Sequence, residues 1–181
     1  MLQNADFTNF GLALTEGCHE TYVSTATKIG PETFRWIVSG VNDSVVPSVQ
    51  SSFYQANGFW IDDATYQLRP EVVESYYYDY RATRDIKYQD WAWEAFQAIS
   101  DVTRVGSGFS EINNVNAVGG GGFKNFQDSF LFAEVLKYAY LVFAEDDMDV
   151  PDEIQVQGPG STQSWVFNTE AHPFRVAGVK V

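Results

Sequence analysis

Hydrophobic side chains recur at the three- and four-residue spacing of a helix in four segments of the chain. The first segment begins at Asp6, which we expect to cap a helix, and ends near Tyr22. The second begins at Pro70, because proline is favoured in the first turn of a helix. The third follows the short connection 82–85, so we expect the second and third helices to form an antiparallel pair. The regularly spaced side chains of the first and third segments are Phe7, Phe10, Leu14, Cys18, Tyr88, Trp91, Ala95, Ile99 and Val102.

The fourth segment, from about Gln127 to Phe143, is apolar on nearly every face. Only Glu134 and Lys137 interrupt it in the middle. Because a helix that is apolar all round is buried, we expect Glu134 to be a buried or half-buried carboxylate. Such a group needs a partner, since an unpaired buried charge is costly.

The segments between these helices carry turn-forming residues. From 30 to 69 we expect irregular structure or short strands, with turn signals at Pro47 and at Asn57-Gly58. The glycine-rich segment 106–122 lacks the spacing of a phosphate-binding loop, so we expect it to be a flexible turn.

Two further segments lie near the C-terminal end of the sequence. The acidic segment 145–153 only superficially resembles a calcium-binding loop, because Pro151 is incompatible with the EF-hand turn. We interpret it as a solvated surface loop. Residues 165–167 are expected to form a short strand that leads into Asn168, Thr169 and Glu170.

The composition is that of a folded, acidic chain. Its 181 residues suffice for one domain with a sizeable core, and 45% hydrophobic and 16% aromatic residues exclude a disordered chain. The net charge of −13 argues against nucleic acid or an anionic membrane as a partner and favours a neutral polyol or a cation. No apolar run in the sequence is long enough to span a bilayer.

Cysteine content and possible processing signals bear on the cellular context. The sequence begins without the features of a secretion signal and enters a helical pattern at once, which is typical of a fragment. Asn42 begins a glycosylation sequon, which has meaning only in the secretory pathway. The single cysteine, Cys18, is either a small buried apolar residue or half of a disulfide whose partner lies outside the chain.

Carboxylates at the start of the second helix are the first candidates for chemistry. Glu71 and Glu74 are three residues apart, so they project from one side of the first turn. Carboxylates at this position also interact favourably with the helix dipole. That interaction alone would explain the presence of either residue without a functional role. Arg69 and the buried Glu134 enlarge the set, and a pair of carboxyl groups is what glycoside hydrolysis requires.

Other residues add oxygen ligands and an apolar platform. Thr169 offers a hydroxyl and a carbonyl on one residue, of the kind that calcium prefers, although a hydroxyl at a strand end is also common. Phe130 precedes Glu134 by one helical turn and is either a core residue or a platform for a sugar ring. His172 is interpreted as a structural hydrogen-bonding residue.

Three segments resemble motifs of the class I α-1,2-mannosidases, glycoside hydrolase family 47. They are 68–75 (LRPEVVES), 129–138 (SFLFAEVLKY) and 167–173 (FNTEAHP), in the family's order. The segments 18–22 (CHETY) and 30–32 (GPE) resemble preceding parts of the family, in the form of its secreted fungal members. The resemblance covers essentially the whole chain. It implies a mainly α fold, a partial (α/α)7 barrel of antiparallel helix pairs with short hairpins at its loops.

The resemblance implies an enzyme that removes terminal α-1,2-linked mannose from high-mannose N-glycans with inversion and with calcium. Glu71 would be the general base, and Thr169 would bind calcium directly through its two oxygens. Phe130 would pack against the mannose ring, and Arg69 would orient the site. The carboxylates expected to hold sugar hydroxyls, or calcium through water, are Glu32, Glu74, Glu134 and Glu170.

Parts of the family pattern have no counterpart here. The general acid, a further catalytic Asp and the disulfide partner of Cys18 belong to segments expected upstream, so residues 1–181 are interpreted as the C-terminal part of one catalytic domain. The N-terminal remainder is then a required partner, and we expect the isolated chain to be inactive. The expected location is the secretory pathway or the exterior. The alternative to an enzyme is a lectin-like module of the same fold that binds glycans without cleaving them.

Overall fold

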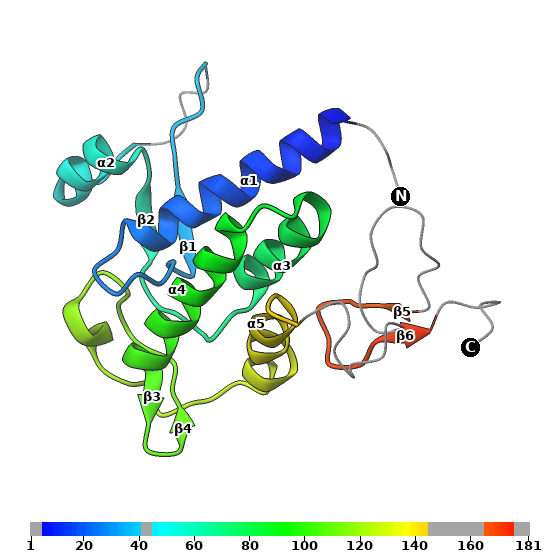
Figure 1. The fold of residues 1–181 in the computed structure, drawn as a ribbon. Helices are drawn as coiled ribbons and strands as arrows, with labels where there is room; N and C mark the ends of the chain where they lie inside the picture. Colours follow the sequence, from blue (N-terminus) through cyan, green and yellow to red (C-terminus); the bar gives the residue numbers. More distant parts are fainter. Residues whose placement is uncertain (1–4, 41–44, 145–164, 176–181) are drawn as a thin grey trace. The chain divides into compact units, whose positions relative to one another are not determined.

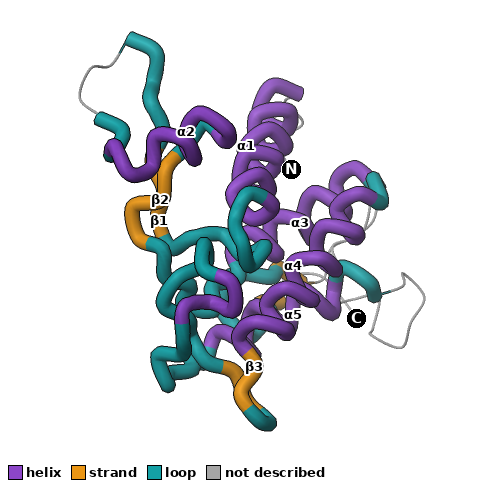
Figure 2. The backbone as a smooth tube through the Cα atoms, turned by 90° about the vertical axis from the view of Figure 1, so that its left-hand side faces the viewer, coloured by secondary structure: helices purple, strands orange, loops and turns teal. Residues whose placement is uncertain are grey.

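The computed structural model describes residues 5–40, 45–144 and 165–175, and helices predominate in it (Figures 1 and 2). The chain divides into two compact units, of which the first comprises residues 1–15, 68–97 and 128–181. The second comprises residues 16–67 and 98–127. The elements are α1 (Ala5–Val23), β1 (Thr33–Arg35), the 3-10 turn η1 (Ser48–Gln50), α2 (Ser51–Asn57), β2 (Trp60–Asp63), α3 (Glu71–Thr83), α4 (Lys87–Thr103), β3 (Arg104–Val105), β4 (Gly108–Phe109), the 3-10 turn η2 (Val118–Gly121), the π-helical turn η3 (Leu131–Val135), α5 (Leu136–Leu141), β5 (Trp165–Val166) and β6 (Phe174–Arg175).

The first unit is organised around α3, which packs against η3 and α5. In this contact the ring centroids of Tyr77 and Tyr138 are 5.5 Å apart. Helix α3 also meets α4, where the rings of Tyr76 and Trp91 are 5.7 Å apart. The strands β5 and β6 form a short antiparallel pair after α5. The buried apolar side chains of this unit are Leu68, Val73, Tyr76, Tyr77, Tyr88, Ala92, Ala95, Leu131, Val135, Tyr138, Leu141, Val142, Ala144 and Phe167.

The second unit holds two antiparallel strand pairs, β1 with β2 and β3 with β4. Ile112 is fully buried and bridges Tyr66 on one side and Phe123 on the other. Thr27 ties the chain after α1 to this region, because its amide and its hydroxyl both donate to the Val115 carbonyl, at 3.0 and 2.8 Å.

The first three predicted helices are confirmed, with small changes at their ends. The helix predicted from Asp6 to Tyr22 spans Ala5–Val23, so Asp6 lies inside the first turn and is not the cap that we expected. Its carboxylate still faces the positive end of the helix dipole there. Pro70 directly precedes α3, and its carbonyl accepts the first helical hydrogen bond, from the Glu74 amide at 2.9 Å.

Helix α2 was not predicted, because Asn57-Gly58 indicated only a turn. In the structure Gly58 caps the end of α2 with φ of 78°, a conformation that glycine adopts without strain. The Gln50 side chain fixes the beginning of this segment, since its amide donates to the Ile61 carbonyl and its oxygen accepts from the Ile61 amide, at 2.7 and 2.9 Å. A contact across 11 residues leaves no periodic signal in the sequence.

The glycine-rich segment, which we expected to be a flexible turn, contains the 3-10 turn η2. The four residues Gly119–Gly122 all have positive φ, and Gly120 is buried. A Cβ atom at Gly120 would lie 3.0 Å from Val102 and 3.1 Å from Ile112. Glycine is therefore required at this position by both the backbone conformation and the close packing.

The fourth predicted helix begins later than expected and is not regular throughout. Its first turn is the π-helical η3, in which the Leu136 amide donates to the Leu131 carbonyl five residues earlier. Glu134 lies in this turn and is buried, as predicted. Such π-helical turns inside regular helices are frequent at functional sites.

Some predictions from the sequence have no structural test. The acidic segment 145–153 and the sequon at Asn42 lie outside the described residues. No helix within the described ranges combines the length and the apolar character that crossing a bilayer requires.

Candidate active site

Three segments of the first unit converge on one site. They are the beginning of α3, the η3–α5 segment and residues 167–170, which the sequence separates by about sixty and thirty positions. Hydrogen bonds between side chains and between side chains and carbonyl groups join all three. The site is therefore built within a single compact unit.

Glu134 and Thr169 form the direct contact between η3 and the last segment. The Thr169 hydroxyl donates to Glu134 Oε2 at 2.5 Å, and Glu134 is only 6% exposed. Burial raises the pKa of the Glu134 carboxyl; the Thr169 hydrogen bond and Lys137 oppose this rise, whereas the charges of Glu170 and Glu71 add to it. The sequence predicted the burial of Glu134 and its need for a partner, and in the structure that partner is Thr169.

Glu74 is joined to the same segment through Tyr138. The Tyr138 hydroxyl lies 2.7 Å from Glu74 Oε1 and 2.7 Å from the Asn168 carbonyl oxygen. The neighbouring Tyr78 hydroxyl donates to the Phe167 carbonyl at 3.4 Å. Burial raises the pKa of Tyr138, and its contact with Glu74 acts in the same direction, so its proton is held firmly.

Lys137, which directly precedes Tyr138 in α5, reaches the same backbone. Its ammonium group donates to the Asn168 carbonyl at 3.1 Å and to the Glu170 carbonyl at 2.5 Å. Burial lowers the pKa of Lys137, while Glu134, Glu74 and Glu170 act in the opposite direction.

The base candidate Glu71 lies at the exposed beginning of α3. Arg69 Nη1 is 3.9 Å from Glu71 Oε1, an exposed ion pair that contributes little to stability. The Arg69 guanidinium also lies 5.9 Å from the centre of the Phe130 ring. Leu68, just before this group, is fully buried with φ of 60°, a strained conformation for a branched side chain. Such strain is common beside functional sites.

The chemistry of these side chains suits a hard cation. Within the described ranges, no three His, Cys, Asp or Glu side chains come close enough together to hold a metal ion on their own. The oxygen ligands that the site offers include the hydroxyl and carbonyl of Thr169 and the carboxylates of Glu74, Glu134 and Glu170. Calcium takes such ligands and completes its shell with water. Carboxylates outnumber cations here and Glu134 is buried, so added positive charge would relieve a real electrostatic cost.

Two predicted site residues belong to the second unit. Glu32 donates its amide to the Thr65 carbonyl at 2.8 Å, and the structure does not place it relative to Glu71 or Thr169. Cys18, on α1, is half-buried and forms no disulfide, as expected for the only cysteine in the chain. Burial raises the pKa of its thiol.

Lys137, Tyr138 and the Asn168 carbonyl are the site groups that the sequence did not identify. A helical spacing signal existed, because Lys137 and Tyr138 follow Glu134 by three and four residues. The many tyrosines of this chain concealed it, since Tyr138 has the pattern of an ordinary core residue.

Comparison with known proteins assigns the class of protein. The sequence pattern of glycosyl hydrolase family 47 matches residues 1–176. The chain therefore belongs to glycosyl hydrolase family 47, as the resemblance of its three motifs predicted.

Individual relatives are fungal α-1,2-mannosidases. The chain is 52% identical over 176 residues to the mannosyl-oligosaccharide alpha-1,2-mannosidase of Coccidioides posadasii, which covers 97% of this chain and 32% of that protein. It is 52% identical over 177 residues to mannosyl-oligosaccharide alpha-1,2-mannosidase 1B of Aspergillus phoenicis, covering 98% of this chain and 32% of the relative. The chain thus spans about a third of the length of the curated relatives that it matches.

A solved structure gives the same result at the level of the fold. The alpha-1,2-mannosidase from Trichoderma reesei matches with a TM-score of 0.84 and 50% identity, over 92% of this chain and 33% of that one. The predicted fold class, mainly helical and part of an (α/α)7 barrel of helix pairs, is confirmed by this likeness.

Proposed function

We propose that the protein containing this chain is a calcium-dependent, inverting α-1,2-mannosidase that removes terminal mannose from high-mannose N-glycans. Membership of glycosyl hydrolase family 47 and relatives of that name support the proposal. The observation that carries it is the convergence of α3, η3–α5 and residues 167–170, in which hydrogen bonds join Glu74, Tyr138, Glu134 and Thr169 into one network. Each of the three motifs that resemble the family contributes to that network.

In the proposed mechanism Glu71 is the general base. It accepts a proton from the water that attacks the anomeric carbon, and its exposed position in the first turn of α3 leaves it open to solvent and substrate. We assign Arg69, whose Nη1 lies 3.9 Å from Glu71 Oε1, to orienting the site beside Glu71. Inversion also requires a general acid on the opposite side of the bond that is cleaved. We assign that acid to the remainder of the domain, outside this chain.

Thr169 is the proposed direct ligand of calcium through its hydroxyl and carbonyl oxygens. We assign Glu32, Glu74, Glu134 and Glu170 to contacts with calcium through water or with sugar hydroxyls. When bound, calcium would fix and polarise water near the reaction centre. Phe130 supplies an apolar ring on which a mannose can pack, beside the guanidinium of Arg69.

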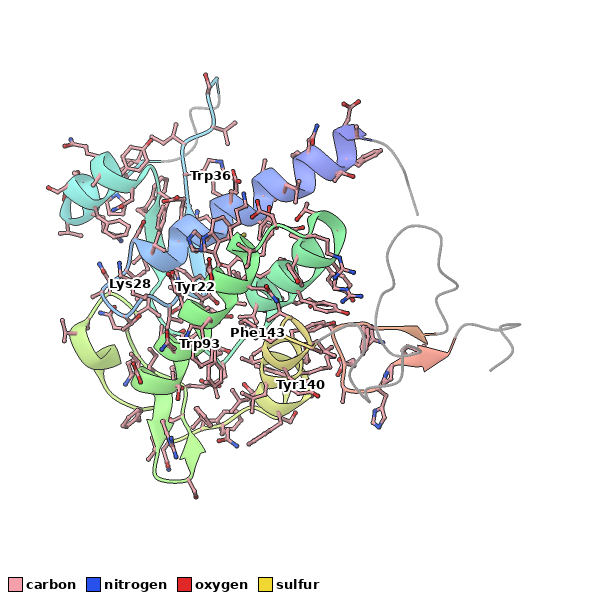
Figure 3. All side chains as sticks on the ribbon, viewed as in Figure 1. Tyr22, Lys28, Trp36, Trp93, Tyr140 and Phe143 are labelled. Carbon is pink, nitrogen blue, oxygen red and sulfur yellow. The ribbon has the colours of Figure 1, made fainter. Side chains whose placement is uncertain are left out.

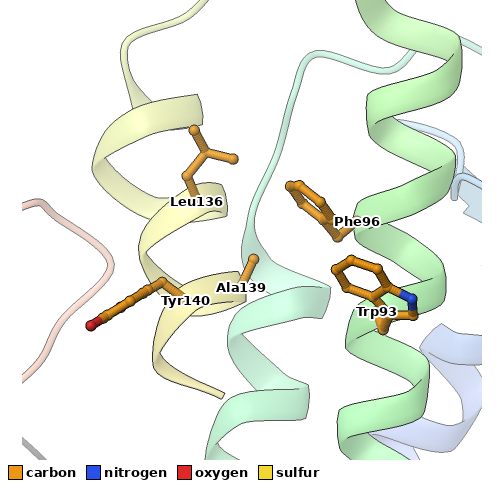
Figure 4. Close-up of a pocket in the computed structure, with 5 residues that line it drawn as sticks. All are labelled: Trp93, Phe96, Leu136, Ala139 and Tyr140. Carbon is orange, nitrogen blue, oxygen red and sulfur yellow. The ribbon is translucent and has the colours of Figure 1, made fainter. Parts of the chain in front are cut away.

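The N-terminal remainder of the catalytic domain is the proposed partner of this chain. Apolar side chains that a complete domain would cover support this assignment: Phe7, Phe10 and Leu14 on α1 are 64%, 63% and 55% exposed. In the first unit an apolar hollow of about 200 Å³ also lies between α4 and α5 (Figure 4). It is lined by Trp93, Phe96, Leu136, Ala139 and Tyr140.

The proposed setting is the secretory pathway or the cell exterior, where the substrate glycans occur. There Cys18 would form a disulfide with a cysteine of the remainder, in the oxidising conditions that permit such bonds.

Mannose release by the full-length protein tests the proposed function. The purified protein would be incubated with a high-mannose N-glycan, after treatment with a chelator and again after calcium is restored. We expect release only with calcium, and β-mannose as the first product by NMR. Glycan binding without any release in calcium would indicate a lectin-like module and contradict the proposal.

A further inference from the structure

The backbone on both sides of Thr169 is held by side chains that have no place in the mechanism above. The carbonyl of Asn168 lies in the peptide plane before Thr169, and it accepts from Tyr138 Oη at 2.7 Å and Lys137 Nζ at 3.1 Å. Because a peptide group is planar, fixing this oxygen also fixes the Thr169 amide.

The peptide plane after Thr169 is fixed as well. It contains the Thr169 carbonyl and the Glu170 amide, and that amide donates to Asn168 Oδ1 at 2.8 Å. In a trans peptide the carbonyl points opposite to the amide, so this hydrogen bond sets the direction of the Thr169 oxygen. Lys137 holds the following carbonyl, that of Glu170, at 2.5 Å.

The oxygens of Thr169 are thereby left in a defined arrangement. Its hydroxyl faces Glu134 at 2.5 Å. Among the described residues, no hydrogen-bond donor takes the Thr169 carbonyl, whereas the Phe167, Asn168 and Glu170 carbonyls all accept from side chains of α3 or α5. This is the pattern of a backbone that is held so that one carbonyl stays available.

We propose that Tyr138 and Lys137 are positioning residues that hold the backbone at Thr169 so that its hydroxyl and carbonyl oxygens face one calcium ion together. This inference rests on the proposed function, because it takes Thr169 as the calcium ligand. The single Tyr138 hydroxyl proton is shared between the Asn168 carbonyl and Glu74 Oε1, each 2.7 Å from Oη, and this couples Glu74 to the Thr169 backbone. Groups that orient metal ligands in this way typically change metal affinity about 10–100-fold when they are removed.

Calcium titration of the full-length protein tests this inference without measuring activity. Tyr138→Phe removes one oxygen atom and keeps the ring that packs against Tyr77. After chelation and dialysis, we expect calorimetry to show about 10-fold weaker calcium binding than in the wild type. Lys137→Met should weaken binding comparably, and Tyr80→Phe is the matched control, since that tyrosine is half-buried on α3 with its ring beside Arg84.

The melting temperature separates positioning from a merely structural role. We expect Tyr138→Phe to melt near the wild type in chelator and to gain less from saturating calcium than the wild type gains. Equal calcium affinity in Tyr138→Phe and wild type would overturn the inference while leaving the proposed function intact. An equal loss of melting temperature with and without calcium would also overturn it. No calcium binding by the wild type would contradict the calcium part of the proposed function and the inference with it.

Discussion

Thr169 connects the buried carboxylate of Glu134 to the proposed calcium site, so its hydroxyl is a direct point of intervention. Thr169→Val keeps the shape of the side chain but removes the oxygen, and it leaves Glu134 without this hydrogen bond. We expect calcium affinity to fall at least about 10-fold, measured by calorimetry on the full-length protein. Thr169→Ser restores the hydroxyl and should recover most of the affinity. Unaltered affinity in the valine variant would remove Thr169 from the calcium site.

Cys18 offers a test of local burial at the same scale. Because burial disfavours the thiolate, the raised pKa of Cys18 means a smaller thiolate fraction at any given pH than in a free thiol. With the protein reduced, iodoacetamide should alkylate Cys18 more slowly than N-acetylcysteine at pH 8, and the rate should keep rising to higher pH. A rate profile equal to that of the free thiol would show that the thiol is not buried.

The sequence predicted the chemically distinctive residues of the site better than their supports. A carboxylate such as Glu134 inside an apolar helix conflicts with its surroundings, and that conflict is visible in the pattern alone. Tyr138 creates no such conflict, since tyrosine is at home in a core. Its role depends on Glu74 and Asn168, which lie 64 and 30 residues away along the chain.

At the scale of elements, periodicity located α1, α3 and α4, whose long apolar patterns dominate their local sequence. It did not locate α2, which has only 7 residues, or the π-helical beginning of the fourth helix. Residues 127–143 are apolar on nearly every face, so they have no apolar stripe. Without a stripe, the spacing of the sequence cannot reveal the extra residue of a π-helical turn. The sequence pattern therefore predicted the burial of Glu134 but not its position in a π-helical turn.

Two neighbouring glycines of η2, Gly119 and Gly120, differ in how closely they are packed. Gly119 and Gly120 both have positive φ, so alanine at either position should cost roughly 1–2 kcal/mol from backbone strain. Only at Gly120 would the new methyl group also meet Val102 and Ile112. At Gly120 alanine should lower the free energy of unfolding by a further overpacking cost of about 1–3 kcal/mol. We therefore expect the urea midpoint of Gly120→Ala to lie clearly below that of Gly119→Ala. Equal midpoints for the two variants would contradict the tight packing at Gly120.

At the scale of the molecule, this chain spans about a third of the length of its relatives and has many large apolar side chains exposed. Large exposed side chains occur on several elements, among them Trp36, Trp93, Tyr140 and Phe143, which Figure 3 labels. Surface of this kind marks a contact with further protein or leads to aggregation. The share of each relative that the chain covers, about a third, agrees with the first explanation.

The isolated chain should therefore be inactive and poorly soluble. We expect no mannose release from a high-mannose glycan by the purified 181-residue polypeptide, because the general acid is assigned to the remainder. Co-expression with the N-terminal remainder as a separate polypeptide should restore soluble protein and release. Matched co-expression with Trp93→Asp and Tyr140→Asp in this chain should impair assembly, as judged by co-purification. Release by the isolated chain would contradict the assignment of the acid.

The assignment of Glu71 as the base is the central claim, and one kinetic comparison tests it most directly. Mannose release would be measured for the full-length wild type, for Glu71→Gln and for the control Glu94→Gln, an exposed carboxylate of α4. Glu71→Gln should lower kcat about 10²–10⁴-fold, the usual contribution of a general base, with glycan affinity largely retained and Glu94→Gln unaffected. Wild-type turnover in Glu71→Gln would contradict the account.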